Sequence, residues 1–160
     1  MVEHDLTAPD PARRAQALRR LARHGDATDA EAVAALIADP GEFDDRDDLN
    51  DPDESARTPV RMVALEALAS LAAPGTHAGE FDRALHDADL RVRAAATLGA
   101  SAGALRARLP MEADRGVRYR IALALLPGDE SAYAILRDLS TGEDLPAQAA
   151  AVILGAVPEA

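Results

Sequence analysis

The sequence predicts an all-α domain built from about five stacked helix pairs. A motif with helical spacing recurs along the chain, and nowhere do apolar and polar residues alternate with the period of two that marks a strand. Ala, the residue with the highest helix propensity, fills 38 of the 160 positions. A chain of this length buries about 70% of its unfolded surface when it folds, so we expect residues 1–160 to form a single domain.

The recurring motif occupies four ten-residue segments, which begin at Arg13, Val60, Leu90 and Val117. The second residue of each segment is Arg, at Arg14, Arg61, Arg91 and Arg118. The fifth and sixth residues are small or apolar, and the ninth is always Leu, at Leu21, Leu68, Leu98 and Leu125. Because these offsets share one helical face, we expect that face to be buried. Leu98→Ala should then cost about 2–5 kcal/mol, as core truncations do.

A weaker fifth copy begins at Pro146 and has Ala147 in place of Arg. Between the copies, second amphipathic helices are expected at 28–38, 77–86, 102–109 and 129–139, with Gly- and Pro-containing turns between most of them. Neither helix of a pair can bury its apolar face alone, so adjacent pairs of about 30 residues must stack.

Three of the repeated Arg residues follow an acid by four positions, the acids being Asp10, Asp87 and Asp114. An acid placed this way lies at a helix start, near the positive end of the helix dipole, and can pair with the Arg one turn later. The second copy breaks the pattern, because Arg57 stands at the equivalent position.

The segments DADLRVRAAATLG, DRGVRYRIALALL and TPVRMVALEALASL resemble the second helix of a HEAT repeat, in particular the short HEAT-like repeats of the phycobilisome lyase type. The resemblance covers about residues 10–157. It implies a right-handed α-α superhelix, a HEAT-like solenoid, whose second helices line a concave surface, and it implies that the Asp/Arg pairs are structural. Proteins of this kind are mostly scaffolds and adaptors, and a few are enzymes or enzyme accessories.

An acidic insertion at about 40–56 interrupts the first repeat. Residues 39–54 contain nine acids and one Arg, and so carry most of the net charge of −11. Such a segment cannot bury enough apolar surface to become ordered, and it reads as a solvated loop. No register within it matches an EF-hand calcium loop. It serves either as a solubilising spacer or as a weak electrostatic lid over the Arg-rich first helix.

Composition argues against several kinds of chemistry. The chain has no Cys, and its four His form no HExxH motif, so we expect no metal site. There is no phosphate-binding Gly-rich loop or catalytic Ser motif, so we expect no cofactor and no catalytic residues. No apolar run could span a membrane and no signal peptide is evident, so we expect a cytoplasmic protein. The acidic net charge argues against nucleic acid as a partner. The lack of Lys fits either a GC-rich genome or a halophile.

Side chains outside the repeated apolar positions are expected to line the concave surface of the second helices: Arg19, Arg20, Met62, Glu66, Val92, Arg93, Tyr119, Arg120 and Leu123. Arg, Tyr and Met are enriched at interface cores. We therefore expect a non-enzymatic protein-binding or scaffold module for another protein or peptide, with an acidic partner as one alternative. The alternative is a lyase-like enzyme or accessory subunit that binds a small anionic ligand in the same groove. The C-terminal helix has Gln148 as its single strongly polar side chain, so we also expect a homodimer through this helix as one outcome.

Overall fold

The computed structural model describes residues 3–44, 57–126 and 128–155. These residues are helical apart from turns and one short antiparallel strand pair, which confirms the predicted all-α class. The elements are α1 (Glu3–Leu6), α2 (Pro11–His24), η1 (Ala27–Asp29), α3 (Ala30–Ala34), η2 (Ala35–Ala38), β1 (Glu42–Phe43), β2 (Thr58–Pro59), α4 (Val60–Leu71), α5 (Ala78–Ala84), α6 (Leu90–Ala96), α7 (Ala102–Arg108), η3 (Leu109–Met111), α8 (Arg115–Leu125), α9 (Glu130–Leu139) and α10 (Leu145–Gly155).

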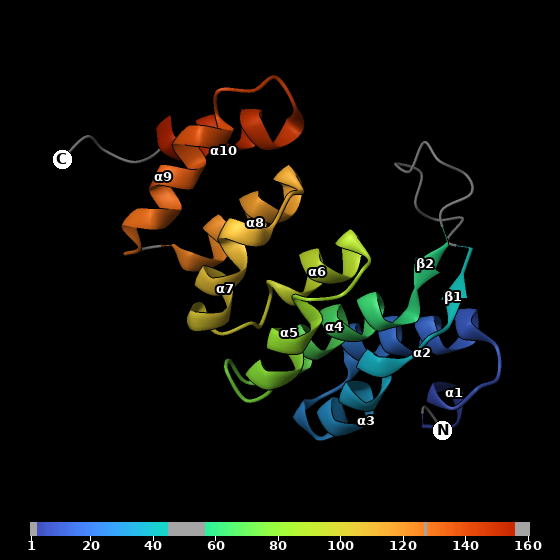
Figure 1. Cartoon of the computed structure of the whole chain (residues 1–160). Helices are drawn as coiled ribbons and strands as arrows, with labels where there is room; N and C mark the ends of the chain where they lie inside the picture. The colour runs from blue at the N-terminus through green and yellow to red at the C-terminus, as the bar shows by residue number, and fades with distance from the viewer. Residues whose placement is uncertain (1–2, 45–56, 127, 156–160) are drawn as a thin grey trace.

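The helices pack in two layers, with α1 and α10 at opposite ends (Figure 1). In one layer, α2, α4, α6, α8 and α10 each contact the next; we call this the even layer. The odd layer contains α1, α3 with η2, α5, α7 and α9, and each of these contacts the even helix that follows it. The second amphipathic helices predicted between the motifs are therefore present, as the odd layer.

Four even helices begin just after an Asp that caps them. The side chains of Asp10, Asp89, Asp114 and Asp144 accept hydrogen bonds from backbone N–H groups in the first turns of α2, α6, α8 and α10. The fifth, α4, follows Pro59 and has no side-chain cap. The core lies between the layers, and Leu18, Leu65, Leu68, Ile121 and Leu136 are among its fully buried side chains.

The prediction that Leu98 is buried is wrong, because this side chain is 54% exposed. The third copy begins two residues later than the motif suggests, since its helix is capped by Asp89. Arg93, not Arg91, is then the fourth helical residue, as Arg14 is in α2 and Arg118 is in α8. The buried positions shift with it to Ala96 and Thr97, and Leu98 falls beyond the end of α6. Leu21, Leu68 and Leu125 are buried as predicted.

The base of the acidic insertion is tied to the domain by a strand pair that the sequence pattern did not reveal. Glu42 pairs with Pro59 and Phe43 with Thr58, and the Phe43 side chain is buried. A strand of two residues is too short to show alternation, so only its tertiary contacts define it. Residues 45–56 lie outside the described residues, and so do the predicted solvated loop and the lid hypothesis.

Truncating Leu68 and Leu98 should separate the corrected motif alignment from the original one. Leu68→Ala removes a fully buried side chain and should lower the free energy of unfolding by about 2–5 kcal/mol. Leu98→Ala should change it by less than about 0.5 kcal/mol, because the side chain is largely in water. Urea unfolding measures both, and equal losses would contradict the corrected alignment.

Candidate functional site

Charge is divided unequally between the two helix layers. The even helices contain one acid, Glu66, and eleven of the seventeen Arg residues: Arg13, Arg14, Arg19, Arg20, Arg23, Arg61, Arg91, Arg93, Arg115, Arg118 and Arg120. The odd-layer helices, together with η1 before α3, contain four Arg residues and eight acids: Arg83, Arg106, Arg108 and Arg137, with Glu3, Asp5, Asp29, Glu31, Glu80, Asp82, Glu130 and Asp138. A chain with a net charge of −11 therefore contains one strongly cationic layer.

Four of these Arg side chains form a regular row, which we call the arginine ladder. Each binds a carboxylate in the turn that leads to the next even helix, through Nε and Nη2. The pairs are Arg14–Asp39, Arg61–Asp87, Arg93–Glu112 and Arg115–Asp144, with Nε to oxygen distances of 2.6, 2.7, 2.8 and 2.6 Å. The ladder thus links α2 to α4, α4 to α6, α6 to α8 and α8 to α10.

Backbone groups complete each step of the ladder. The carboxylates of Asp39, Asp87, Glu112 and Asp144 also accept a backbone N–H from a residue two or three positions further on. Arg14 and Arg93 use Nη1 in the same way, each donating to two carbonyls of the turn before its own helix. Every buried side-chain nitrogen or oxygen in the described part of the chain has a hydrogen-bond partner. The ladder is therefore a satisfied network that fixes consecutive turns.

The ladder differs from the predicted charge pairs. Asp10 and Asp114 cap their helices, and the partners of the ladder Arg residues lie 19–29 positions away in sequence. Arg91 instead pairs with Asp89 at 2.8 Å and donates to the carbonyl of Arg57. Arg118 pairs with Asp138 at 3.3 Å.

Glu112 is the most deeply buried carboxylate of the ladder, with a side chain that is 1% exposed. Burial alone would raise its pKa. Hydrogen bonds from Arg93, the backbone of Asp114 and Arg108 outweigh that effect and lower the pKa from 4.5 to about 2. At Asp39, burial raises the pKa, but the hydrogen bonds from Arg14 outweigh this effect and the pKa is lowered. At Asp87, the hydrogen bonds from Arg61 lower the pKa. These carboxylates therefore remain charged at neutral pH.

The predicted ridge residues fall into two groups. Val92 is 1% exposed and Arg93 belongs to the ladder, so the expectation that these two supply open surface is wrong. The burial of Val92 and the ladder role of Arg93 both result from the two-residue shift of the third copy. The other predicted residues are exposed or half-buried on the even layer: Arg19, Arg20, Met62, Glu66, Tyr119, Arg120 and Leu123. Arg19 lies 5.5 Å from the centre of the Phe43 ring, and Arg20 pairs with Asp5.

Cationic and apolar side chains share the open side of the even layer, which we call the even-layer face. Its exposed cations include Arg13, Arg23 and Arg120, which form no ion pair within the described residues. Large exposed hydrophobic residues in the described ranges are Leu90, Leu98, Met111, Leu145 and Val152, and all except Met111 lie on, or just after, an even helix. Leu145 and Val152, which are 79% and 71% exposed, belong to the helix through which a homodimer was predicted.

A groove of about 360 Å³ lies between the C-terminal ends of α4 and α6 and the start of α5. We call it the Leu98 groove. Its walls include Ala69, Ala72, Phe81, Leu98 and Gly99. A Cβ atom on Gly99 would lie 2.5 Å from the Phe81 ring, so the ring can pack here only against glycine. Sequence patterns could not reveal the groove, because it depends on this contact between α5 and the turn after α6.

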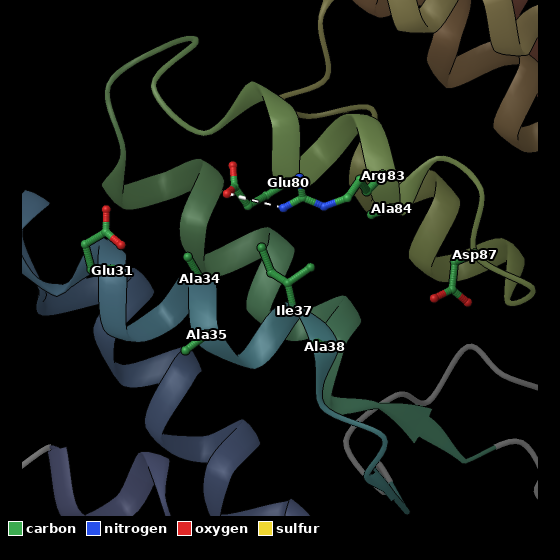
Figure 2. Close-up of a pocket in the computed structure, with 9 residues that line it drawn as sticks. All are labelled: Glu31, Ala34, Ala35, Ile37, Ala38, Glu80, Arg83, Ala84 and Asp87. Carbon is green, nitrogen blue, oxygen red and sulfur yellow. Dashed lines mark hydrogen bonds and ion pairs between the residues drawn. The ribbon is translucent and has the colours of Figure 1, made fainter.

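A second groove, of about 490 Å³, lies in the odd layer between α3–η2 and α5 (Figure 2). Its apolar wall consists of Ile37 and several Ala residues. The charges at its rim are largely compensated within the chain: Glu80 pairs with Arg83 at 3.4 Å, and Asp87 is bound by Arg61. This groove is larger than the Leu98 groove, and the acid Glu31 at its rim has no ion pair within the described residues.

Comparison of the chain with protein-family models, with curated proteins and with solved structures finds no significant match. Among the described residues, no three His, Asp or Glu side chains come together as metal ligands would. Across the same residues, none of the helices combines the length and apolar character needed to cross a bilayer.

Breaking the ladder at its most buried step should be costly. Arg93→Ala leaves Glu112 buried without one of its two Arg partners, and we expect the free energy of unfolding to fall by about 3 kcal/mol. The control is Arg106→Ala, which breaks a 2.6 Å ion pair with Asp129 in which the Arg side chain is 56% exposed, and it should cost less than about 1 kcal/mol. Urea unfolding that gives equal losses for the two variants would contradict the structural role of the ladder.

Proposed function

We propose that this chain is a non-enzymatic, cytoplasmic protein-binding module: a short HEAT-like solenoid with a right-handed superhelical stack. It binds an acidic partner protein on its even-layer face. One observation carries this proposal. The even helices contain eleven Arg residues and one acid in a strongly acidic chain, and they also bear most of the large exposed hydrophobic side chains of the described residues.

The Arg residues of the even layer form two groups, one in the ladder and one on the open face, and this separation supports the same function. The ladder uses Arg14, Arg61, Arg93 and Arg115 at the edge where the even helices begin. Other Arg residues remain on the open face, among them Arg13, Arg23 and Arg120. Cations beside exposed apolar side chains are typical of a surface that attracts an acidic partner electrostatically and then excludes water from the contact.

The exposed apolar residues also favour protein association over simple solvation. Leu90 begins α6 and Leu98 lies in the turn that follows it, and neither is packed into the core. Exposed apolar groups that cluster on one face, with polar groups around them, mark association surfaces. The half-buried Met62 and Tyr119, on the neighbouring even helices, are residue types enriched at such surfaces.

Site-specific photo-crosslinking in the cells that make the protein tests this assignment. A photoreactive residue placed at Gln16, Ser70 or Ala124 lies on an exposed position of the even layer, and at Ala32, Ala107 or Ala134 it lies on an exposed position of the odd layer. We expect covalent protein adducts at the even-layer positions and not at the odd-layer ones.

A matched charge reversal completes this test. Arg20→Glu with Arg120→Glu should reduce the even-layer adducts about tenfold or more, whereas Arg83→Glu with Arg137→Glu makes the same change in net charge on the odd layer and should leave them unchanged. Adducts confined to the odd layer, or even-layer adducts that are insensitive to the first pair of substitutions, would overturn the proposal.

A further inference from the structure

We propose that the Leu98 groove is the socket in which an acidic segment of the partner protein places a large apolar side chain, while its acids pair with Arg23. This inference rests on the proposed function and adds the chemistry of the partner and the place where it is anchored. Its occupant is a peptide segment with acidic residues on one side and a bulky Leu, Phe or Trp on the other.

The groove has the size and lining of an apolar socket. Its volume of about 360 Å³ falls in the range of small binding pockets, roughly 300–1,000 Å³. Small side chains along the end of α4, at Ala69, Ala72 and Ala73, leave this space open, and the buried Phe81 ring lies at its inner side. Leu98 stands at the rim with more than half of its surface in water.

The polar side chains of the groove already face acids within the chain. Ser101 donates to Asp82 from its backbone N–H at 2.7 Å and from its hydroxyl at 2.8 Å. The ring of His77 is mostly buried, with Nδ1 3.9 Å from a carboxylate oxygen of Glu80. An incoming apolar side chain therefore displaces water from apolar walls without stripping hydrogen bonds from the protein.

Charge complementarity identifies the rest of the occupant. Gly25, the residue after α2, lies against Leu71 at the end of α4, since a Cβ on Gly25 would be 3.1 Å from the Leu71 side chain. This contact brings the end of α2, with the exposed Arg23, to the same edge of the molecule as the groove. Packed helices are about 8–10 Å apart, so one segment of two to three helical turns reaches both.

The test uses a phage-displayed library of random peptides of about sixteen residues, selected against the full chain. We expect the selected peptides to be net acidic and to share one large apolar residue. Leu98→Ser and Arg23→Glu should each weaken their binding about tenfold or more, as measured by fluorescence anisotropy with synthetic copies.

Two substitutions serve as matched controls. Met111→Ser alters a large apolar side chain that is similarly exposed but lies in η3, outside the groove, and Arg137→Glu alters an exposed Arg on the odd layer. Each should change binding by less than about threefold. Ala73→Trp, which fills the groove from an exposed rim position, should abolish binding and so tests the socket without removing Leu98.

The outcomes separate this inference from the proposed function. Acidic peptides that respond equally to Leu98→Ser and Met111→Ser would overturn the socket, while even-layer crosslinks in cells would still support the binding face. Basic peptides, or a selection that yields no binder, would also overturn the inference. Crosslinks confined to the odd layer would remove the proposed function itself.

Discussion

The stacking of this domain depends on one repeated interaction, the Arg–carboxylate pair that joins each even helix to the turn before the next. A guanidinium that binds through two nitrogens fixes both distance and direction, which one apolar contact does not. The same carboxylates hold backbone N–H groups of their own turns, so each pair sets the local turn and the long-range contact together. Desolvation makes such pairs costly when they are incomplete, and here each is complete.

The ladder also explains how an acidic protein comes to present a cationic surface. Many of its acids lie in turns, and those at the starts of the even helices are engaged as caps or ladder partners. The Arg residues further along the helices have no comparable set of acids within the even layer, because Glu66 is the single acid in its helices. The proposed binding face is thus a direct consequence of where the structural pairs are placed.

Helical periodicity was sufficient to predict the all-α class, the alternating second helices and the burial of Leu21, Leu68 and Leu125. It gave the wrong alignment for the third copy. Arg91 and Arg93 are two residues apart there, and so are Asp87 and Asp89, so two alignments fit the motif. Hydrogen bonding decides between them: Asp89 caps α6, while Asp87 receives Arg61. The ladder partners could not be predicted, because a local acid four residues earlier already satisfied the pattern for three of the four motif Arg residues. The Leu98 groove depends on tertiary contact between Gly99 and Phe81.

The most direct test of the ladder is an NMR titration that follows the side-chain carboxyl carbons of Asp39, Asp87, Glu112 and Asp144 in the folded protein. The structure predicts that all four titrate below their ordinary pKa values, with Glu112 at about 2. A folded-state pKa below the unfolded value contributes stability above pH 4.5, and this contribution is lost as the pH falls towards 2. A Glu112 carboxyl that titrates near 4.5 would contradict the ladder as the interaction that holds the stack together.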